Sequence, residues 1–121
     1  MTLRVPDPKG RLDGPKQMDS IVPNLVHSLD AAHMMLTLRE LRAAGIEDFA
    51  MVHDSYAVHA SDVDVMNRVL REQFIRVHEE FTLEGFAEGL RKVAPDVEIK
   101  TPPTPGSLDL RDIVRSEYFF S

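Results

Sequence analysis

One short stretch in the middle of the chain constrains the fold most. An apolar run from Phe49 to Val52 ends at the pair His53-Asp54, and Tyr56-Ala57-Val58 then forms a second apolar run. Two such runs on either side of a short polar segment are typical of a β-hairpin, although Asp and Ser are also common in ordinary turns. The sequence therefore predicts an antiparallel hairpin over about residues 47–59, with the carboxylate of Asp54 at its tip.

Helical periodicity surrounds this hairpin. Apolar residues recur at spacings of three and four from Leu25 to Ala44, Pro23 suits a first helical turn, Asn24 can cap it, and Gly45 is a stop signal. We expect a helix there that is largely buried, because apolar residues surround much of it. The pattern predicts further helices over 61–81, 82–93 and 108–114.

These elements place the chain in the α+β class, with long helices packed on a small antiparallel hairpin. The first 20 residues contain three prolines and two glycines, which predicts a linker or the end of an upstream strand, and Thr2-Leu3-Arg4-Val5 is the candidate strand. Residues 21–121 form the predicted domain. Because the run from Phe49 to Val52 is apolar on both faces, we expect both to be covered, one by the first helix and the other by chain that is not part of this sequence.

Composition limits the functions that the chain can perform alone. The net charge is −6, whereas proteins that bind nucleic acid unaided are usually basic. The 43% hydrophobic content fits a globular domain, and no apolar stretch is long enough for a membrane span. The absence of cysteine excludes disulfides and thiolate metal sites and is compatible with a reducing compartment. We expect a cytoplasmic location, with the mitochondrial matrix as the alternative.

Four motifs resemble single-subunit DNA-directed RNA polymerases of the phage and mitochondrial type. They occur in the same order as in that family and cover about residues 20–121. They are Pro23-Asn24-Leu25-Val26-His27-Ser28-Leu29-Asp30-Ala31-Ala32-His33-Met34-Met35, the hairpin motif His53-Asp54-Ser55-Tyr56, the stretch from Ala60 to Phe74, and the ending Asp109-Leu110 with Tyr118-Phe119-Phe120-Ser121. The resemblance implies that residues 21–121 are part of a polymerase palm, its C-terminal segment.

The resemblance also implies a catalytic site. Such enzymes hold two Mg²⁺ ions on two palm carboxylates, and Asp54 matches the second carboxylate. His53 would lie on the opposite face of its strand and contact the nucleic acid or brace the hairpin, since strand side chains alternate. His27 and Ser28 match positions near the template–product duplex. The partners would be DNA template, nascent RNA and nucleoside triphosphates, within a full polymerase.

Parts of that site are missing from this sequence. The first palm aspartate and the fingers helix of the family lie upstream of the matching region, so we expect the chain to be inactive alone and to need an N-terminal polymerase fragment. Two alternatives stay open: a non-catalytic interaction module derived from a polymerase, and a fragment of a family A DNA polymerase. Ser55 argues against the second, because that family usually has Glu after its His-Asp pair.

Several other residues allow a functional interpretation that we consider weaker. Asp30 and Asp54 resemble an acid–base pair of a hydrolase, but Asp30 is expected to cap or pair within its own helix. Ser55 beside His53 lacks the signals of a nucleophile elbow. We expect structural or solvent-facing roles for His33, His59 and His78 rather than a zinc site.

Overall fold

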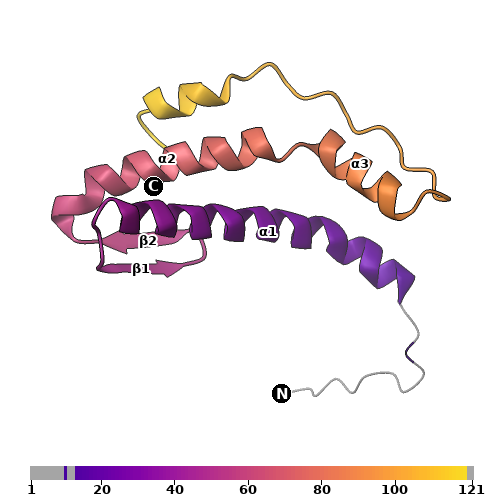
Figure 1. Ribbon diagram of the computed structural model, residues 1–121, viewed down its shortest axis with the longest axis horizontal. Coiled ribbons are helices and arrows are strands. Elements are labelled where there is room, and N and C mark those ends of the chain that lie inside the picture. The colour runs from indigo at the N-terminus through magenta and orange to yellow at the C-terminus, as the bar shows by residue number, and fades with distance from the viewer. Residues whose placement is uncertain (1–9, 11–12, 120–121) are drawn as a thin grey trace.

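The structure is a computed structural model that describes residue 10 and residues 13–119. Its elements are α1 (Gly14–Ala43), β1 (Phe49–Val52), β2 (Ser55–Val58), the 3-10 turn η1 (Ala60–Asp62), α2 (Val63–Glu80), α3 (Leu83–Val93) and the 3-10 helix η2 (Leu110–Arg115). Figure 1 shows the hairpin beside one end of α1, with α2 on the other side of that helix and η2 beyond α2. The predicted α+β class is confirmed.

Helix α1 starts earlier than the sequence pattern predicted. Asp13 is its N-cap, and the Asp13 carboxylate accepts a hydrogen bond of 3.2 Å from the Lys16 N–H, while Pro15 lies in the first turn. Pro23, expected at the first turn, lies inside the helix, where proline costs about 3 kcal/mol. The prediction failed because two start signals compete: a cap such as Asp13 contributes only about 1 kcal/mol, so the helical turns before Pro23 and their contacts must offset the rest of the penalty.

The early start also changes the expected linker. Residues 14–20 are helical, whereas the sequence predicted irregular chain over 1–20. The candidate strand Thr2-Leu3-Arg4-Val5 lies outside the described residues. The proposed boundary of a domain at residue 21 stays a prediction.

The C-terminal end of α1 joins the helix to the hairpin, as the sequence predicted. Gly45 has φ 87°, its N–H donates to the Arg42 carbonyl, and the Ile46 N–H donates to the Leu41 carbonyl at 3.0 Å. This bonding is a Schellman motif, which favours glycine because other residues are strained at positive φ. The apolar contact of that motif joins Leu41 to Ile46, and both belong to the core. The motif therefore fixes the direction in which the chain enters β1.

The core lies where α1, α2 and the hairpin meet. Leu41, Ile46 and Val69 are buried, and the partly buried residues packed against them are Phe49, Met51, Val58, Val65 and Met66. Burial on β1 alternates, so that Phe49 and Met51 face the core while Ala50 and Val52 face outward. The outer face of β1 has no cover among the described residues, where Val52 is 69% exposed. The expected cover of that face by chain outside this sequence stays a prediction.

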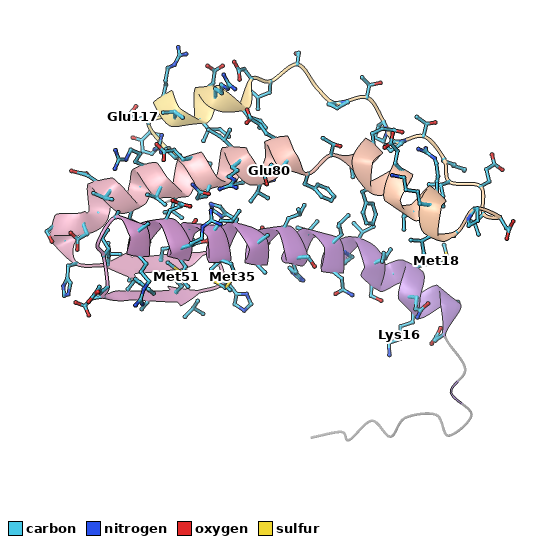
Figure 2. The ribbon with its side chains drawn as sticks, viewed as in Figure 1. Lys16, Met18, Met35, Met51, Glu80 and Glu117 are labelled. Carbon is cyan, nitrogen blue, oxygen red and sulfur yellow. The ribbon has the colours of Figure 1, made fainter. Side chains whose placement is uncertain are left out.

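Helix α1 is also less buried than its apolar pattern predicted. Its buried residues are His33, Thr37 and Leu41, whereas Ile21, Val22 and Val26 are exposed. Figure 2 shows Lys16 and Met18 on the part of α1 that extends away from the hairpin. Only the opposite end of α1 lies between the hairpin and α2 (Figure 1). The physical reason is that the hairpin and α2 are too short to cover the whole helix.

The remaining helices agree with the sequence within a few residues. Helix α2 lies between α1 and η2 (Figure 1) and is buried toward both of them. Helix α3 is capped by the Thr82 hydroxyl, which accepts from the Gly85 N–H at 3.0 Å. An extended segment connects α3 to η2 (Figure 1). None of the helices formed by the described residues has the length and hydropathy that crossing a bilayer requires.

Candidate functional site

The predicted carboxylate lies in a tight, exposed turn. Strands β1 and β2 pair antiparallel with Val52 opposite Ser55, so His53 and Asp54 form a two-residue turn. His53 has φ 54°, a conformation that costs energy for a residue other than glycine. Short hairpin turns use positive φ because it matches the twist of the strands. The strand pairing therefore fixes the backbone of Asp54 at the turn, and its side chain is exposed.

The turn faces a cavity of about 730 Å³ between the hairpin and α1. The residues that line it are His27, Asp30, Ala31 and Met34 of α1, with Met51, His53 and Asp54 of the hairpin. The four helical residues follow at spacings of three and four, which places them on one side of α1. The lining of the cavity thus combines two carboxylates and two imidazoles with the apolar side chains of Ala31, Met34 and Met51.

His53 does not lie opposite Asp54 as the sequence suggested. Both residues line the same cavity. The expectation used the alternation of side chains along a strand, but β1 ends at Val52 and the turn residues are outside its pleat. His53 is consequently placed to contact whatever ligand approaches Asp54.

The structure brings together three of the four predicted site residues. Asp54, His53 and His27 line one cavity, whereas the Ser28 hydroxyl donates to the Asn24 carbonyl at 2.7 Å within α1 and Ser28 is not among the lining residues. These positions leave the proposed roles of the four residues untested.

Asp30 is a residue that the sequence analysis considered and left out of the site. Instead of the expected partner within its helix, the Asp30 side chain faces the cavity shared with Asp54. The available signal was its spacing of three residues from His27, which puts both on one side of the helix. That signal did not show which side of α1 meets the hairpin.

Tyr56 lies within electrostatic reach of both carboxylates. Burial raises the pKa of the Tyr56 phenol, and the negative charges of Asp30 and Asp54 raise it further. Tyr56 lies on β2, half-buried, with its ring 6.2 Å from the ring of His33. The phenol therefore stays protonated and neutral beside two acids.

The other histidines have the structural or exposed roles that we expected. His33 is 5% exposed, and its Nε2 lies 2.9 Å from the Leu70 carbonyl oxygen. His78 stacks on Phe74 and hydrogen-bonds the Phe74 carbonyl, while the exposed His59 lies 3.5 Å from Asp48.

His33 should make the stability of the protein depend on pH. Burial lowers its pKa below 6.5; the hydrogen bond with Leu70 opposes this, the nearby His78 lowers the pKa further, and Asp30 raises it. The unfolded chain therefore binds the proton at a higher pH than the folded one, so stability is complete above about pH 6.5 and falls as the pH drops toward the folded pKa. Urea unfolding at about pH 7.5 and pH 5.5 measures this loss. His33→Gln, which keeps a donor for Leu70, should reduce the difference, and an equal loss in both proteins would contradict the assignment.

The donor set suits Mg²⁺ in kind but is incomplete. Mg²⁺ prefers hard oxygen ligands and is often bound by one or two carboxylates together with substrate phosphates. Asp54 and Asp30 offer such oxygens in one cavity. Within the described part of the chain, no group of three or more His, Asp or Glu side chains could hold a metal ion. The two carboxylates are thus suitable in kind as Mg²⁺ ligands, but the described residues do not form a metal site by themselves.

Comparison with known proteins identifies the family. The family model for DNA-dependent RNA polymerase matches residues 1–96. The chain belongs to this family. The polymerase match contains both site motifs, the helical one around His27 and the hairpin around Asp54, and it ends before the C-terminal aromatic residues.

Individual relatives of this polymerase segment come from plants. The chain is 45% identical over 106 residues to DNA-directed RNA polymerase 1, mitochondrial, of Arabidopsis thaliana, an alignment that covers 88% of this chain and 11% of the relative. It is 43% identical to DNA-directed RNA polymerase 1A of Nicotiana tabacum, covering 68% of that protein. DNA-directed RNA polymerase 2B, chloroplastic/mitochondrial, of Nicotiana tabacum is 44% identical, with 10% covered. The chain thus spans about a tenth of the length of the longer relatives.

Proposed function

We propose that this chain is the C-terminal palm segment of a single-subunit DNA-directed RNA polymerase, in which Asp54 is one of the catalytic carboxylates. The observation that carries this proposal is the exposed Asp54 carboxylate, held by a two-residue turn at the edge of a cavity. The family match supports an RNA polymerase over the alternative of a family A DNA polymerase fragment. The reaction would be template-directed transfer of ribonucleotides to the 3′ end of RNA.

The four residues predicted from the sequence then have proposed tasks. Asp54 would ligate Mg²⁺, which when bound activates the attacking hydroxyl and neutralises the triphosphate. His27 and His53 would donate hydrogen bonds to the primer end and the duplex. Ser28 is exposed next to His27, and its hydroxyl oxygen can still accept a hydrogen bond from nucleic acid.

The missing ligands and the net charge both require a partner. A second carboxylate and basic side chains that neutralise phosphates would come from an N-terminal polymerase portion, whether joined to this chain or separate. DNA template, nascent RNA and nucleoside triphosphates would bind only to that assembly. The names of the relatives favour the mitochondrial alternative over the cytoplasm as the location.

Complementation tests this function directly. The Arabidopsis mitochondrial relative, truncated where the match to this chain begins, is mixed with the chain, a primed template and Mg²⁺. We expect RNA synthesis only when both parts are present, and incorporation of ribonucleotides in preference to deoxyribonucleotides. If the two parts form a complex that makes no RNA, the chain is a non-catalytic interaction module and the proposal is wrong.

A further inference from the structure

Arg71 of α2 is a buried cation that holds the end of the chain. It is only 8% exposed. Its Nε donates to Asn67 Oδ1 at 2.8 Å, and its Nη1 donates to the carbonyl oxygens of Ile113 at 2.9 Å, Val114 at 3.4 Å and Ser116. Among the described residues, no carboxylate lies within ion-pair distance of Arg71. Backbone carbonyls therefore replace the water that this charge loses.

The position of these carbonyls explains why arginine suits the site. They belong to the last turn of η2 and the residue directly after it, where carbonyl groups carry partial negative charge. The Ile113 carbonyl also accepts from the Ser116 N–H at 3.2 Å. A guanidinium presents several donors in one plane and can serve a side chain on its own helix and several carbonyls at once. Arg71 thus fastens residues 113–119 to α2. Figure 2 shows Glu117, which belongs to this segment, beside that helix.

A series of aromatic contacts leads from this segment toward the candidate site. The Arg71 guanidinium carbon lies 5.6 Å from the centre of the Phe119 ring. Phe119 meets Phe74 at 5.1 Å, and Phe74 meets His33 at 5.7 Å, both in edge-to-face geometry. His33 in turn lies 6.2 Å from Tyr56. Tyr56 pairs with Met51 across the hairpin, and Met51 lines the cavity that Asp54 also lines.

We propose that Arg71 is a positioning residue for the candidate site: by holding residues 113–119 on α2, it fixes Phe119 and thereby the rings of His33 and Tyr56 beside the Asp54 turn. The catalytic meaning of this contact rests on the proposed function, whereas the structural coupling does not. Packed side chains transmit a displacement because interiors have little free volume.

Nuclear magnetic resonance of the full chain tests the coupling. Arg71→Ala should increase amide exchange of residues 113–119 and shift the ring signals of His33 and Tyr56 together with the Asp54 amide. Arg71→Lys should restore these signals only in part, because an ammonium group cannot reach the same set of acceptors. Arg76→Ala is the matched control, since Arg76 lies on the same helix but forms an exposed ion pair with Glu80.

Two outcomes would overturn the proposal. Release of residues 113–119 with unchanged His33 and Tyr56 signals would show that Arg71 acts only locally. Should Arg71→Ala fail to fold by circular dichroism, Phe119→Ala removes the ring contact while Arg71 stays in place. The His33 and Tyr56 signals should then shift, and unchanged signals would equally refute the coupling.

The complemented polymerase gives the catalytic readout. Arg71→Ala should lower kcat by about tenfold, because small displacements of a reacting group are costly, with little change in KM for the nucleoside triphosphate, which Arg71 does not touch. A raised KM with unchanged kcat would contradict a positioning role. If the wild-type mixture makes no RNA, the proposed function fails, and the spectroscopic result still decides whether Arg71 controls the turn.

Discussion

Asp54→Asn should lower the rate of RNA synthesis by the complemented polymerase at least about a hundredfold, the range seen when one group that stabilises a transition-state charge is removed. Asparagine keeps the size and one oxygen but removes the negative charge that attracts Mg²⁺. The Mg²⁺ concentration that gives half the maximal rate should also rise. Titration of Mg²⁺ against the initial rate measures both effects.

Asp48→Asn is the control for that substitution. Asp48 is a second exposed carboxylate, directly before β1, and the cavity next to α1 does not include it. Its replacement should leave RNA synthesis unchanged. Because the side chains of Asp48 and Asp54 are both exposed, neither variant should alter the free energy of unfolding by more than about 0.5 kcal/mol. Normal synthesis by Asp54→Asn would show that Asp54 is not a metal ligand.

The largest effect on stability should come from Leu41→Ala, with a loss of about 3 kcal/mol in the free energy of unfolding. Leu41 is fully buried, packs in the core with Ile46 and Val69, and belongs to the Schellman motif that ends α1. Truncation removes apolar contacts and leaves a cavity. Urea unfolding followed by circular dichroism gives the value.

Leu108→Ala provides the comparison for the core substitution. Leu108 is 74% exposed in the segment before η2, so the same chemical change should cost less than about 0.5 kcal/mol. Equal losses for the two variants would mean that the core is not organised around Leu41.

Local signals in the sequence were sufficient for the hairpin and for the end of α1. The turn at His53-Asp54 follows from the two apolar runs beside it, and Gly45 ends the helix because the Schellman motif requires positive φ. The start of α1 was not predictable in the same way, since Asp13 with Pro15 and Pro23 with Asn24 are both acceptable start signals. Only the balance over the whole helix decides between them.

The candidate site was predictable only where its residues are neighbours in sequence. Asp54 and His53 follow from the hairpin, but Asp30 joins them because one side of α1 packs against that hairpin. Periodicity shows which residues share a side of a helix and does not show what that side touches. The contact of Arg71 with carbonyls more than forty residues away in sequence depends on tertiary structure for the same reason.

The strained turn has a consequence for how this site can change over time. His53 and Asp54 occupy their places through the ladder of main-chain hydrogen bonds between β1 and β2, to which every residue except proline contributes equally. Surrounding side chains can therefore be exchanged while the acid stays where it is. A carboxylate anchored by peptide groups in this way leaves its neighbourhood free to adapt to new binding partners.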